Sequence, residues 1–470
     1  MKHFYSSKKQ GIADLIFQYE VMSQKGTVFS LEETEFKQIL DFYESEQATD
    51  KALQIVEQAL GQHPYSGELL LRKARYLVSS NQSEKAIEIL DDAESLGHTL
   101  KDTDLLRAQA LGYLRHYQEA LGILYDLKFR HYLSRKELSD VLFQEAWIHE
   151  KLENFDRMYE TLREALLENR SNHRALERIW IAVELCRKYQ ESIVLHHHVL
   201  DEDPYSYQAW FNLGHAYYSC NDYENAIKAF EYAFLINEKF ELAYRDYGEV
   251  CFELKQYRKA LNCYLEYMEQ FDADSDLLAK VGECYEYLGK INKAKIYFFR
   301  ALGLDQRNDE VYFHIGECYA KEGHLGSAIH FYKQAIRLDS RREDYLVALA
   351  DVYLQMDKPR KALPLLRQAT EIAPEETTYW IKYASYFLKT DQLEKAHRIL
   401  TQALQNSFGA DLHYCMSACL FGLNCRKEAL HELGEGLMEN FEAHSIFFQF
   451  AAAYQEDRDV KAIIRYYKGE

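Results

Sequence analysis

Residues 207–236 read YQAWFNLGHAYYSCNDYENAIKAFEYAFLI, and this stretch decides the fold. The apolar and small residues of its first half fall on one face of a helix, predicted over about 207–219. Those of its second half fall on one face of another helix, predicted over about 223–236. The positions concerned are Trp210, Leu213, Gly214, Tyr217, Ala226, Phe230 and Ala233.

The same pattern repeats along the chain. The small residue that opens each second helix recurs every 34 residues, apart from one interval of 38 and two of 33. These positions are Ala52, Ala86, Ala120, Met158, Ser192, Ala226, Ala260, Ala294, Ala328, Ala362, Ala396, Ala429 and Ala462. A single helix pair of this length cannot bury its apolar face, so neighbouring pairs must stack on it. Alanine or glycine where two helices cross allows their axes to approach closely.

The pattern W-x2-L-G-x2-Y, followed by alanine, an aromatic residue and alanine, resembles the tetratricopeptide repeat. The resemblance is to the long bacterial-type members of that family, and it covers the chain from about residue 30 to the end. Pro64, Pro204 and Pro374 stand where the family often places a proline. The resemblance implies an all-α fold, a right-handed superhelical solenoid of about 12–13 helix-turn-helix repeats. In that fold the first helices line a concave inner wall.

The N-terminal end is predicted to cap the repeat array. Residues 1–29 form a tail and a capping helix, the helix lying at about 14–24, and residues 30–470 form one continuous solenoid. Ser30-Leu-Glu-Glu33 has the capping-box pattern, which predicts that the first repeat helix begins there.

The C-terminal end carries the last predicted helix pair, at about 444–456 and 459–468. The second of these segments reads DVKAIIRYYK, which is charged and aromatic. It is therefore predicted to be a C-terminal capping helix that shields the final interface.

Residues 127–200 are the least regular stretch of the repeat array. The interval of 38 residues predicts four extra residues in the linker around 131–140. Beyond it, Met158 replaces the usual alanine, and Trp180 stands where glycine or alanine is normal. The stretch indicates a change of pitch or a special contact surface, with sequence drift compensated by packing as the alternative.

Composition and charge restrict the class of partner and the location. The 470 residues carry a formal net charge of −19, from 75 acidic and 56 basic residues. Net acidity repels phosphate backbones and no basic stripe is evident, so no nucleic acid is expected as a partner. The sequence has no run of about 18 apolar residues and no signal-peptide core, so no membrane insertion is expected. Nine cysteines without CxxC spacing are typical of reduced thiols, which favours a cytoplasmic location.

Motifs for catalysis and for metal binding were sought and none was found. No nucleotide-binding, hydrolase or metalloprotease motif occurs, so neither an enzyme nor a cofactor is expected. His196, His197 and His198 are consecutive, so on a helix they point in three directions and cannot share one ion. Cys415 and Cys419 share a helix face without further ligands, and they are predicted to be core thiols.

The predicted binding surface lies on the first helices. In the resembled family, the residue after each first-helix glycine faces the concave groove, and here it is acidic in four successive repeats. The predicted groove residues are Phe211, His215, Arg245, Glu249, Glu283, Phe313, Glu317 and Asp351. A second row, Asp276, Glu310 and Asp344, is explained equally well by the helix dipole. A solvated acidic face without a binding role is the alternative for the whole surface.

These features predict a non-catalytic protein-interaction scaffold or adaptor that binds partner segments in the groove. An acidic trough with aromatic side chains favours a segment rich in lysine and arginine. Glu249 and Glu283 would repel a carboxylate, which argues against the carboxylate clamp of chaperone adaptors. An RNA-binding helical-repeat protein and a regulatory subunit of a larger enzyme complex are the alternatives. The sequence does not predict the oligomeric state.

Overall fold

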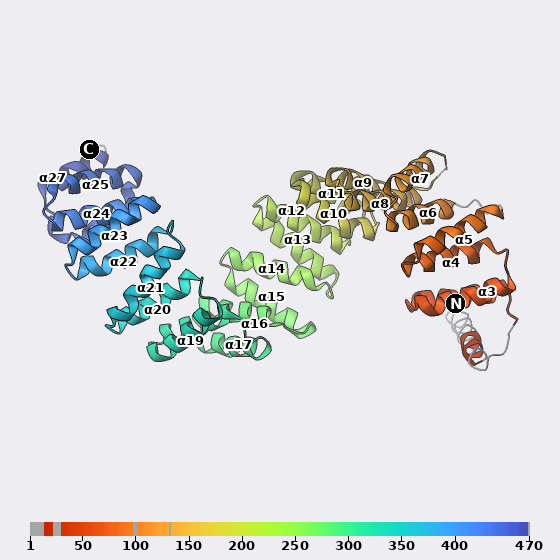
Figure 1. The fold of residues 1–470 in the computed structure, drawn as a ribbon, viewed down its shortest axis with the longest axis horizontal. Helices are drawn as coiled ribbons and strands as arrows, with labels where there is room; N and C mark the ends of the chain where they lie inside the picture. Colours follow the sequence, from red (N-terminus) through yellow and green to blue (C-terminus); the bar gives the residue numbers. More distant parts are fainter. Residues whose placement is uncertain (1–13, 22–29, 97–100, 131–132, 469–470) are drawn as a thin grey trace. The chain divides into compact units, whose positions relative to one another are not determined.

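The computed structural model describes residues 14–21, 30–96, 101–130 and 133–468. Every regular element in these residues is helical, and successive helices form antiparallel pairs joined by short turns (Figure 1). The protein is therefore all-α and built from helical repeats, as the sequence pattern predicts.

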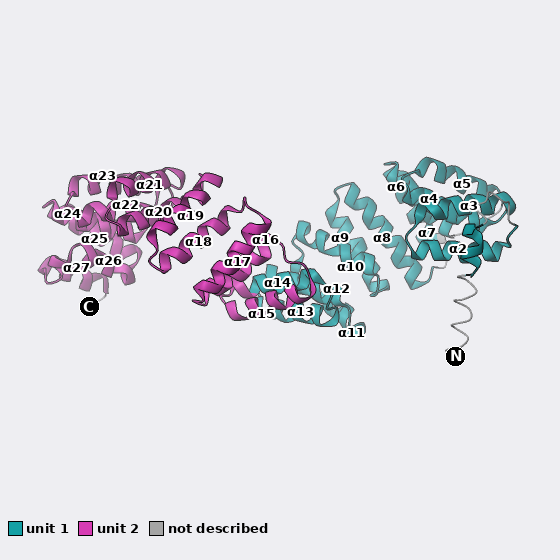
Figure 2. Cartoon of the chain, turned by 90° about the horizontal axis from the view of Figure 1, so that it is seen from below, with its two compact units in different colours: residues 1–250 teal, residues 251–470 magenta. Residues whose placement is uncertain are grey.

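The chain divides into two compact units, residues 1–250 and residues 251–470 (Figure 2). Within each unit, helices that follow one another in the sequence pack together. The single continuous solenoid over residues 30–470 stays a prediction.

In the first unit, most first helices have 13 residues and most second helices have 14. The bounds of α12 and α13 match the two helices predicted from the repeat pattern. The helices are α2 (Glu33–Ser45), α3 (Thr49–Gln62), α4 (Gly67–Ser79), α5 (Ser83–Ser95), α6 (Lys101–Tyr113), α7 (Tyr117–Arg130), α8 (Arg135–Lys151), α9 (Phe155–Glu168), α10 (His173–Cys186), α11 (Tyr189–Glu202), α12 (Tyr207–Ser219), α13 (Tyr223–Ile236) and α14 (Glu241–Glu253).

The second unit continues the same alternation. The boundary between the units lies within α14. The remaining elements are α15 (Tyr257–Gln270), α16 (Ser275–Tyr287), α17 (Ile291–Leu304), α18 (Asp309–Lys321), α19 (Leu325–Leu338), α20 (Glu343–Gln355), α21 (Pro359–Ile372), α22 (Thr377–Lys389), α23 (Leu393–Asn406), α24 (Ala410–Gly422), α25 (Arg426–Glu439), η1 (Phe441–His444), α26 (Ser445–Phe450), η2 (Ala452–Tyr454) and α27 (Arg458–Lys468).

The small residues predicted at the helix crossings are buried, with one exception. From Ala52 to Ala429, each of these residues is at most 1% exposed. Ala462, however, is exposed, and Val460 takes the buried position of α27. The prediction for Ala462 is wrong because the last helix pair lacks a full first helix for α27 to cross.

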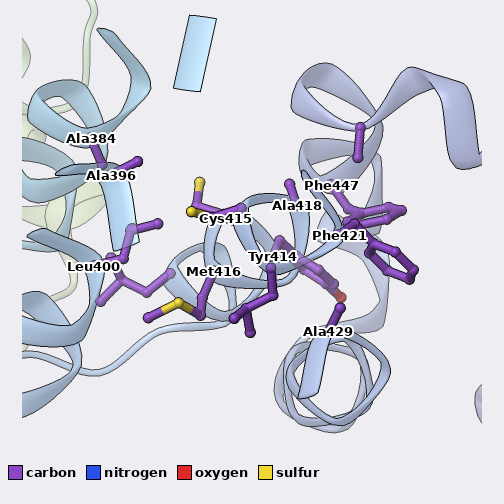
Figure 3. Packing of buried hydrophobic residues seen from close by; sticks show 14 of the residues in the cluster. Ala384, Ala396, Leu400, Tyr414, Cys415, Met416, Ala418, Phe421, Ala429 and Phe447 are labelled. Carbon is purple, nitrogen blue, oxygen red and sulfur yellow. The ribbon is translucent and has the colours of Figure 1, made fainter. Parts of the chain in front are cut away.

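Two kinds of crossing occur, and the side chain of the second helix decides between them. Where that side chain is aromatic, the first helix carries glycine. A Cβ added at Gly214 would lie only 2.6 Å from the ring of Phe230. At other crossings the second helix carries leucine and the first helix carries alanine, and Ala384 and Leu400 share one buried cluster (Figure 3). A large ring and a Cβ therefore exclude each other at the crossing.

Helix α8 contains the four extra residues of the 38-residue interval. It has 17 residues, four more than α12, and it begins at Arg135, soon after α7 ends at Arg130. Ser134 and Glu137 cap its start: the Glu137 carboxylate accepts a hydrogen bond from the Ser134 N–H at 2.7 Å. The prediction of a longer linker is therefore wrong, because this capping box adds a turn to the helix.

The first repeat helix begins later than predicted. Helix α2 starts after Glu32, whose N–H donates to the Glu35 carboxylate at 2.9 Å. Leu31 is buried, and its N–H donates to Oε1 of Gln62 at 3.1 Å. Because the chain is tied to α3 at Leu31, it enters the helix only afterwards, and the capping box predicted at Ser30 is wrong.

Residues 14–21 form a helix that packs on the first repeat. Tyr19 is buried there, and its hydroxyl donates to Oε1 of Gln58 at 2.6 Å. The predicted continuation over residues 22–24 lies outside the described residues.

The helix predicted at about 444–456 is wrong, because the structure has three short segments there: η1, α26 and η2. Tyr454 explains the break. Its hydroxyl donates to the carbonyl of Phe421 at 3.2 Å, and the two rings lie 4.4 Å apart. The ring of Phe421 also contacts Phe447 (Figure 3). The Phe421 carbonyl also accepts a hydrogen bond from the Asn424 N–H at 3.1 Å, so Tyr454 adds a second donor at the end of α24.

Candidate functional site

Four first helices of the second unit, α16, α18, α20 and α22, line a pocket of about 670 Å³. Helix α18 contacts both α16 and α20, so side chains from successive repeats meet in the pocket. One side chain, Tyr332, comes from the second helix α19. The charged lining residues are Glu286, His314, Glu317, Lys321, Asp344, Asp351 and Lys382.

Glu286 is the most buried carboxylate of the pocket, at 6% exposed. Its Oε1 accepts a hydrogen bond from Nζ of Lys321 at 2.6 Å, and its Oε2 accepts one from Nδ1 of His314 at 3.0 Å. Burial alone would raise the pKa of Glu286, but the bonds from His314 and Lys321 outweigh burial and lower it. Burial opposes the charge on His314 as well, yet the bond to Glu286 raises the pKa of the imidazole. The three side chains thus form a charged cluster that ties α16 to α18.

Glu317 is positioned by a glycine and a tyrosine. Its Oε1 accepts a hydrogen bond from the hydroxyl of Tyr332, which is only 1% exposed. The Tyr332 ring lies directly against Gly316, where an added Cβ would be 2.6 Å from it. Burial, and then the charge of Glu317, raise the pKa of Tyr332, so the phenol stays a hydrogen-bond donor. The glycine next to Glu317 therefore makes room for the ring that holds its carboxylate.

The two aspartates of α20 pair with basic residues from neighbouring segments. Oδ2 of Asp351 forms an ion pair with Nζ of Lys382 on α22, and each side chain is 39% exposed. Oδ2 of Asp344 lies 3.2 Å from Nη2 of Arg342, whose Nη1 lies 3.0 Å from Glu310. Pairs this exposed stabilise the fold by less than about 1 kcal/mol each, so a ligand can displace them at little cost.

Aromatic rings form the remaining walls. Phe313 is half-buried and stacks on Tyr345 at 4.7 Å between ring centroids. Tyr287 is 53% exposed and presents its ring to the pocket. The pocket therefore combines carboxylates with ring faces, the two groups that attract an ammonium or guanidinium ion.

Three of the four predicted groove residues in this unit come together. Phe313, Glu317 and Asp351 all line the pocket. Glu283 lies outside the lining; its side chain is 12% exposed, and its Oε1 is 3.5 Å from Nζ of Lys280.

In the first unit, the structure brings Phe211 and His215 together on α12. Phe211 is 7% exposed, and its ring lies 4.5 Å from the imidazole of His215. Nε2 of His215 is 3.0 Å from Oδ2 of Asp246. The indole of Trp180 lies 4.5 Å from the same imidazole. Trp180, which departs from the small-residue rule, therefore packs on the predicted groove surface of the next repeat.

The other two predicted residues of the first unit are on α14. Nε of Arg245 lies 3.3 Å from Oε1 of Glu241, one helical turn away. Glu249 is exposed. The predicted row is thus made of residues in different states, some buried in packing, some paired and some open to solvent.

Sequence reasoning missed the central members of the pocket: Glu286, His314, Lys321, Tyr332 and Lys382. Glu286 lies one turn beyond Glu283 on the same helix face, which was a usable signal. The pairing with His314 and Lys321 joins two repeats, and a search for opposite charges between successive first helices would have found it.

Two second helices of this unit, α17 and α19, carry the opposite charge. Helices α17 and α19 have five basic residues and no acidic one: Lys293, Lys295, Arg300, Lys333 and Arg337. The first helices α16 and α18 have six acidic residues and two lysines. The expectation that the chain has no basic stripe is therefore wrong. Acidic and basic helices alternate from α16 to α21, so the stripe appears only when the second helices of this segment are considered together.

The described residues contain no cluster of three or more potential metal-ligating side chains, and none of their helices has the length and hydropathy to cross a membrane. His196 is fully buried, its Nδ1 donates to the Ser192 carbonyl at 2.7 Å, and burial lowers its pKa to about 4. His197 and His198 are exposed, so the three histidines diverge as predicted.

The stack of short antiparallel helix pairs with small residues at each crossing defines a helical-repeat protein. Three family models, each of the tetratricopeptide repeat, match residues 207–240, residues 275–308, and residues 44–112 and 319–386. The chain is a member of the tetratricopeptide-repeat family. Repeats of this kind are protein-interaction modules, and none of the matching models describes a catalytic family.

Solved structures show similar folds at low sequence identity. One is YrrB, described as a TPR protein with an unusual peptide-binding site; it is 22% identical, covers 39% of this chain and 95% of its own, and has a TM-score of 0.33. Another is the APC/C hetero-tetramer Cut9–Hcn1, which is 13% identical, covers 87% of this chain and 97% of its own, and has a TM-score of 0.39. No curated protein sequence matches the chain significantly.

Proposed function

We propose that the chain is a non-catalytic scaffold that binds a basic segment of a partner protein in the pocket of α16, α18, α20 and α22. The observation that carries the proposal is the excess of acid in the pocket, where four carboxylates face two lysines and one histidine. The four are Glu286, Glu317, Asp344 and Asp351.

The geometry favours one lysine or arginine side chain as the inserted group. In the described contacts of Glu317, its Oε1 accepts a hydrogen bond from the hydroxyl of Tyr332, and its Oε2 accepts none. Asp351 is paired only with Lys382 among the described residues, and both are well exposed. An incoming guanidinium would exchange with the ammonium of Lys382 and pair with the carboxylate of Asp351. Because the exchange replaces one ion pair by another, the affinity falls as salt rises.

The test is a charge reversal in the pocket with a matched control. Glu317→Lys with Asp351→Lys reverses two pocket charges. Glu266→Lys with Glu269→Lys makes the same change at two exposed residues of the second helix α15. Crosslinked capture from the native cell, followed by binding of an arginine-rich peptide, compares the two variants with the unmodified chain.

The proposal expects the pocket variant alone to lose the basic partner and the peptide. Equal capture and equal peptide binding by all three chains would refute it. Retention of RNA in a filter assay would instead favour the RNA-binding alternative, and co-purification of an enzyme would favour the regulatory subunit. A cytoplasmic location stays a prediction, and fractionation of the native cell tests it.

A further inference from the structure

The second helices α17 and α19 expose a basic face that the proposed pocket does not use. Lys293 and Arg300 on α17 are exposed, and so are Lys333 and Arg337 on α19. Their spacings of seven and four residues place each pair on one side of its helix. In a chain with a net charge of −19, two neighbouring second helices without any acidic residue are a local reversal of sign.

These four basic residues are unpaired in the part of the chain that the structure describes. None of them takes part in an ion pair there, although Lys295 on the same helix pairs with Glu322 at 2.7 Å. The guanidinium of Arg300 lies over the ring of its neighbour Tyr297, at 5.1 Å from the centroid, which leaves its charge uncompensated. A group of unpaired like charges raises the local potential and attracts an anion.

Apolar side chains lie among these charges. Ile296 is 58% exposed and Phe299 is 45% exposed, both on α17. The Phe299 ring contacts Phe331 of α19 at 5.9 Å, and Phe331 stacks on Tyr319 at 5.4 Å. The contact joins the two helices and leaves part of the Phe299 ring open to solvent. We call Lys293, Ile296, Phe299, Arg300, Lys333 and Arg337 the basic strip.

We propose that the basic strip binds a short acidic segment of a partner protein, with an apolar side chain of that segment packed on Ile296 and Phe299. The acidic groups would pair with the lysines and arginines, and the apolar group would cover the exposed ring. This surface shares no residue with the pocket, which is lined by first helices and by Tyr332 of α19.

The net charge of the chain favours a short segment over an extended polyanion. A nucleic acid or an anionic membrane presents charge over a long range, and it would also face the acidic first helices. Salt screens charges beyond about 8 Å at physiological ionic strength, so a short peptide responds to the strip alone. Exposed isoleucine and phenylalanine add apolar contact that a phosphate backbone does not match.

The probe is a fluorescent peptide of glutamate, leucine and phenylalanine, and its anisotropy is measured with the full chain at low and at physiological salt. Lys333→Glu with Arg337→Glu should weaken binding at least about tenfold, because two attractive contacts become repulsive. Arg398→Glu with Lys427→Glu, at exposed positions of α23 and α25, makes the same change in net charge and should leave binding unchanged.

Two further arms separate charge from apolar contact. Replacing the glutamates of the peptide by glutamine should abolish binding, and Ile296→Ser should weaken it severalfold without changing the circular dichroism. The pocket variant Glu317→Lys with Asp351→Lys should bind the acidic peptide as well as the unmodified chain does, so failure of one site is distinguishable from failure of the other.

Three outcomes would overturn the proposal. The first is equal binding of the peptide by the strip variant and its control. The second is binding of the glutamine peptide as tight as that of the glutamate peptide. The third is selective binding of single-stranded RNA or of vesicles containing phosphatidylserine while the acidic peptide fails to bind.

Discussion

The first helices α16 and α18 and the second helices α17 and α19 carry opposite charges, and the two sets differ in how those charges are paired. Every carboxylate of α16 and α18 has a partner: Asp276, Glu283, Glu286, Asp309, Glu310 and Glu317 all form a hydrogen bond or an ion pair. The basic residues of the strip on α17 and α19 form no ion pair among the described residues.

The difference separates charges that hold the fold from charges that are free to bind. A largely buried pair such as Glu286 with His314 has already lost most of its water, so breaking it costs stability. An exposed and unpaired group such as Arg337 contributes little to the fold and keeps its full potential for a partner. The sign of the charge on a helix face therefore does not identify a binding surface by itself. It must also be known whether the charged side chains are already paired within the chain.

The largest expected effect is in the cluster of Glu286, His314 and Lys321, which we call the paired wall. Glu286→Ala leaves His314 and Lys321 without their anion, and we expect it to lower the free energy of unfolding by about 2–3 kcal/mol. Urea unfolding followed by circular dichroism measures the loss, and hydrogen exchange should localise it to α16 and α18. Glu283→Ala is the matched control one turn away, where a single 3.5 Å contact to Lys280 is lost. Equal losses for the two variants would contradict the central role of Glu286.

The second effect tests the crossing that holds Glu317. Gly316→Ala places a Cβ 2.6 Å from the Tyr332 ring, and we expect a loss of about 1–3 kcal/mol from overpacking. The control is Gly303→Ala in α17, where a Cβ meets nothing within 4 Å. Alanine is the better helix former, so the control should gain up to about 1 kcal/mol. Unfolding midpoints that shift in the same direction would show that the ring moves aside without cost.

The repeat unit could be predicted from the sequence because the same small residues must return at every crossing. Gly214 and Phe230 show why, since neither can change without the other. The interval of 38 residues gave the number of extra residues but not their place. The Ser134–Glu137 cap decided that they join α8, and a periodicity does not contain that information.

The candidate site was only partly predictable. Helical spacing placed Phe313, Glu317 and Asp351 on one face, and the structure brings them into one pocket. The spacing does not say which groups of the neighbouring helix face them. The partners Lys382 of Asp351 and Tyr332 of Glu317 depend on how the repeats stack, and that geometry is set by packing.

The third effect is a pH dependence that belongs to the paired wall. The pKa of His314 is raised in the folded state, so its pairing with Glu286 stabilises the fold fully below the unfolded value of about 6.5. The stabilisation is lost as the pH rises through the folded pKa, because the imidazolium then loses its proton. The free energy of unfolding measured from pH 5.5 to 8.5 should therefore fall more steeply in the unmodified chain than in His314→Asn.

The sign of the difference follows from the raised pKa of His314, and the separation of the two curves measures its size. The pKa of His413 is also raised, by its hydrogen bond to Glu432. The unmodified chain and the His314→Asn variant both keep this contribution, so the difference between their curves comes from His314. Parallel curves for the two chains would show that His314 is neutral in the folded state. A selective NMR titration of the imidazole then gives its pKa directly.

The smallest expected change in the free energy of unfolding belongs to the basic strip, and we predict that this change is close to zero. Lys333→Ala with Arg337→Ala should change the free energy of unfolding by less than about 0.5 kcal/mol, because neither side chain has an ionic partner to lose. Lys321→Ala in the paired wall should cost about 1 kcal/mol, because it removes the 2.6 Å bond to the buried Glu286. If the strip variant were the more destabilised of the two, its basic residues would be structural after all. The same double alanine variant should still lose the acidic peptide, and this separation of stability from binding is what distinguishes a free surface from a paired one.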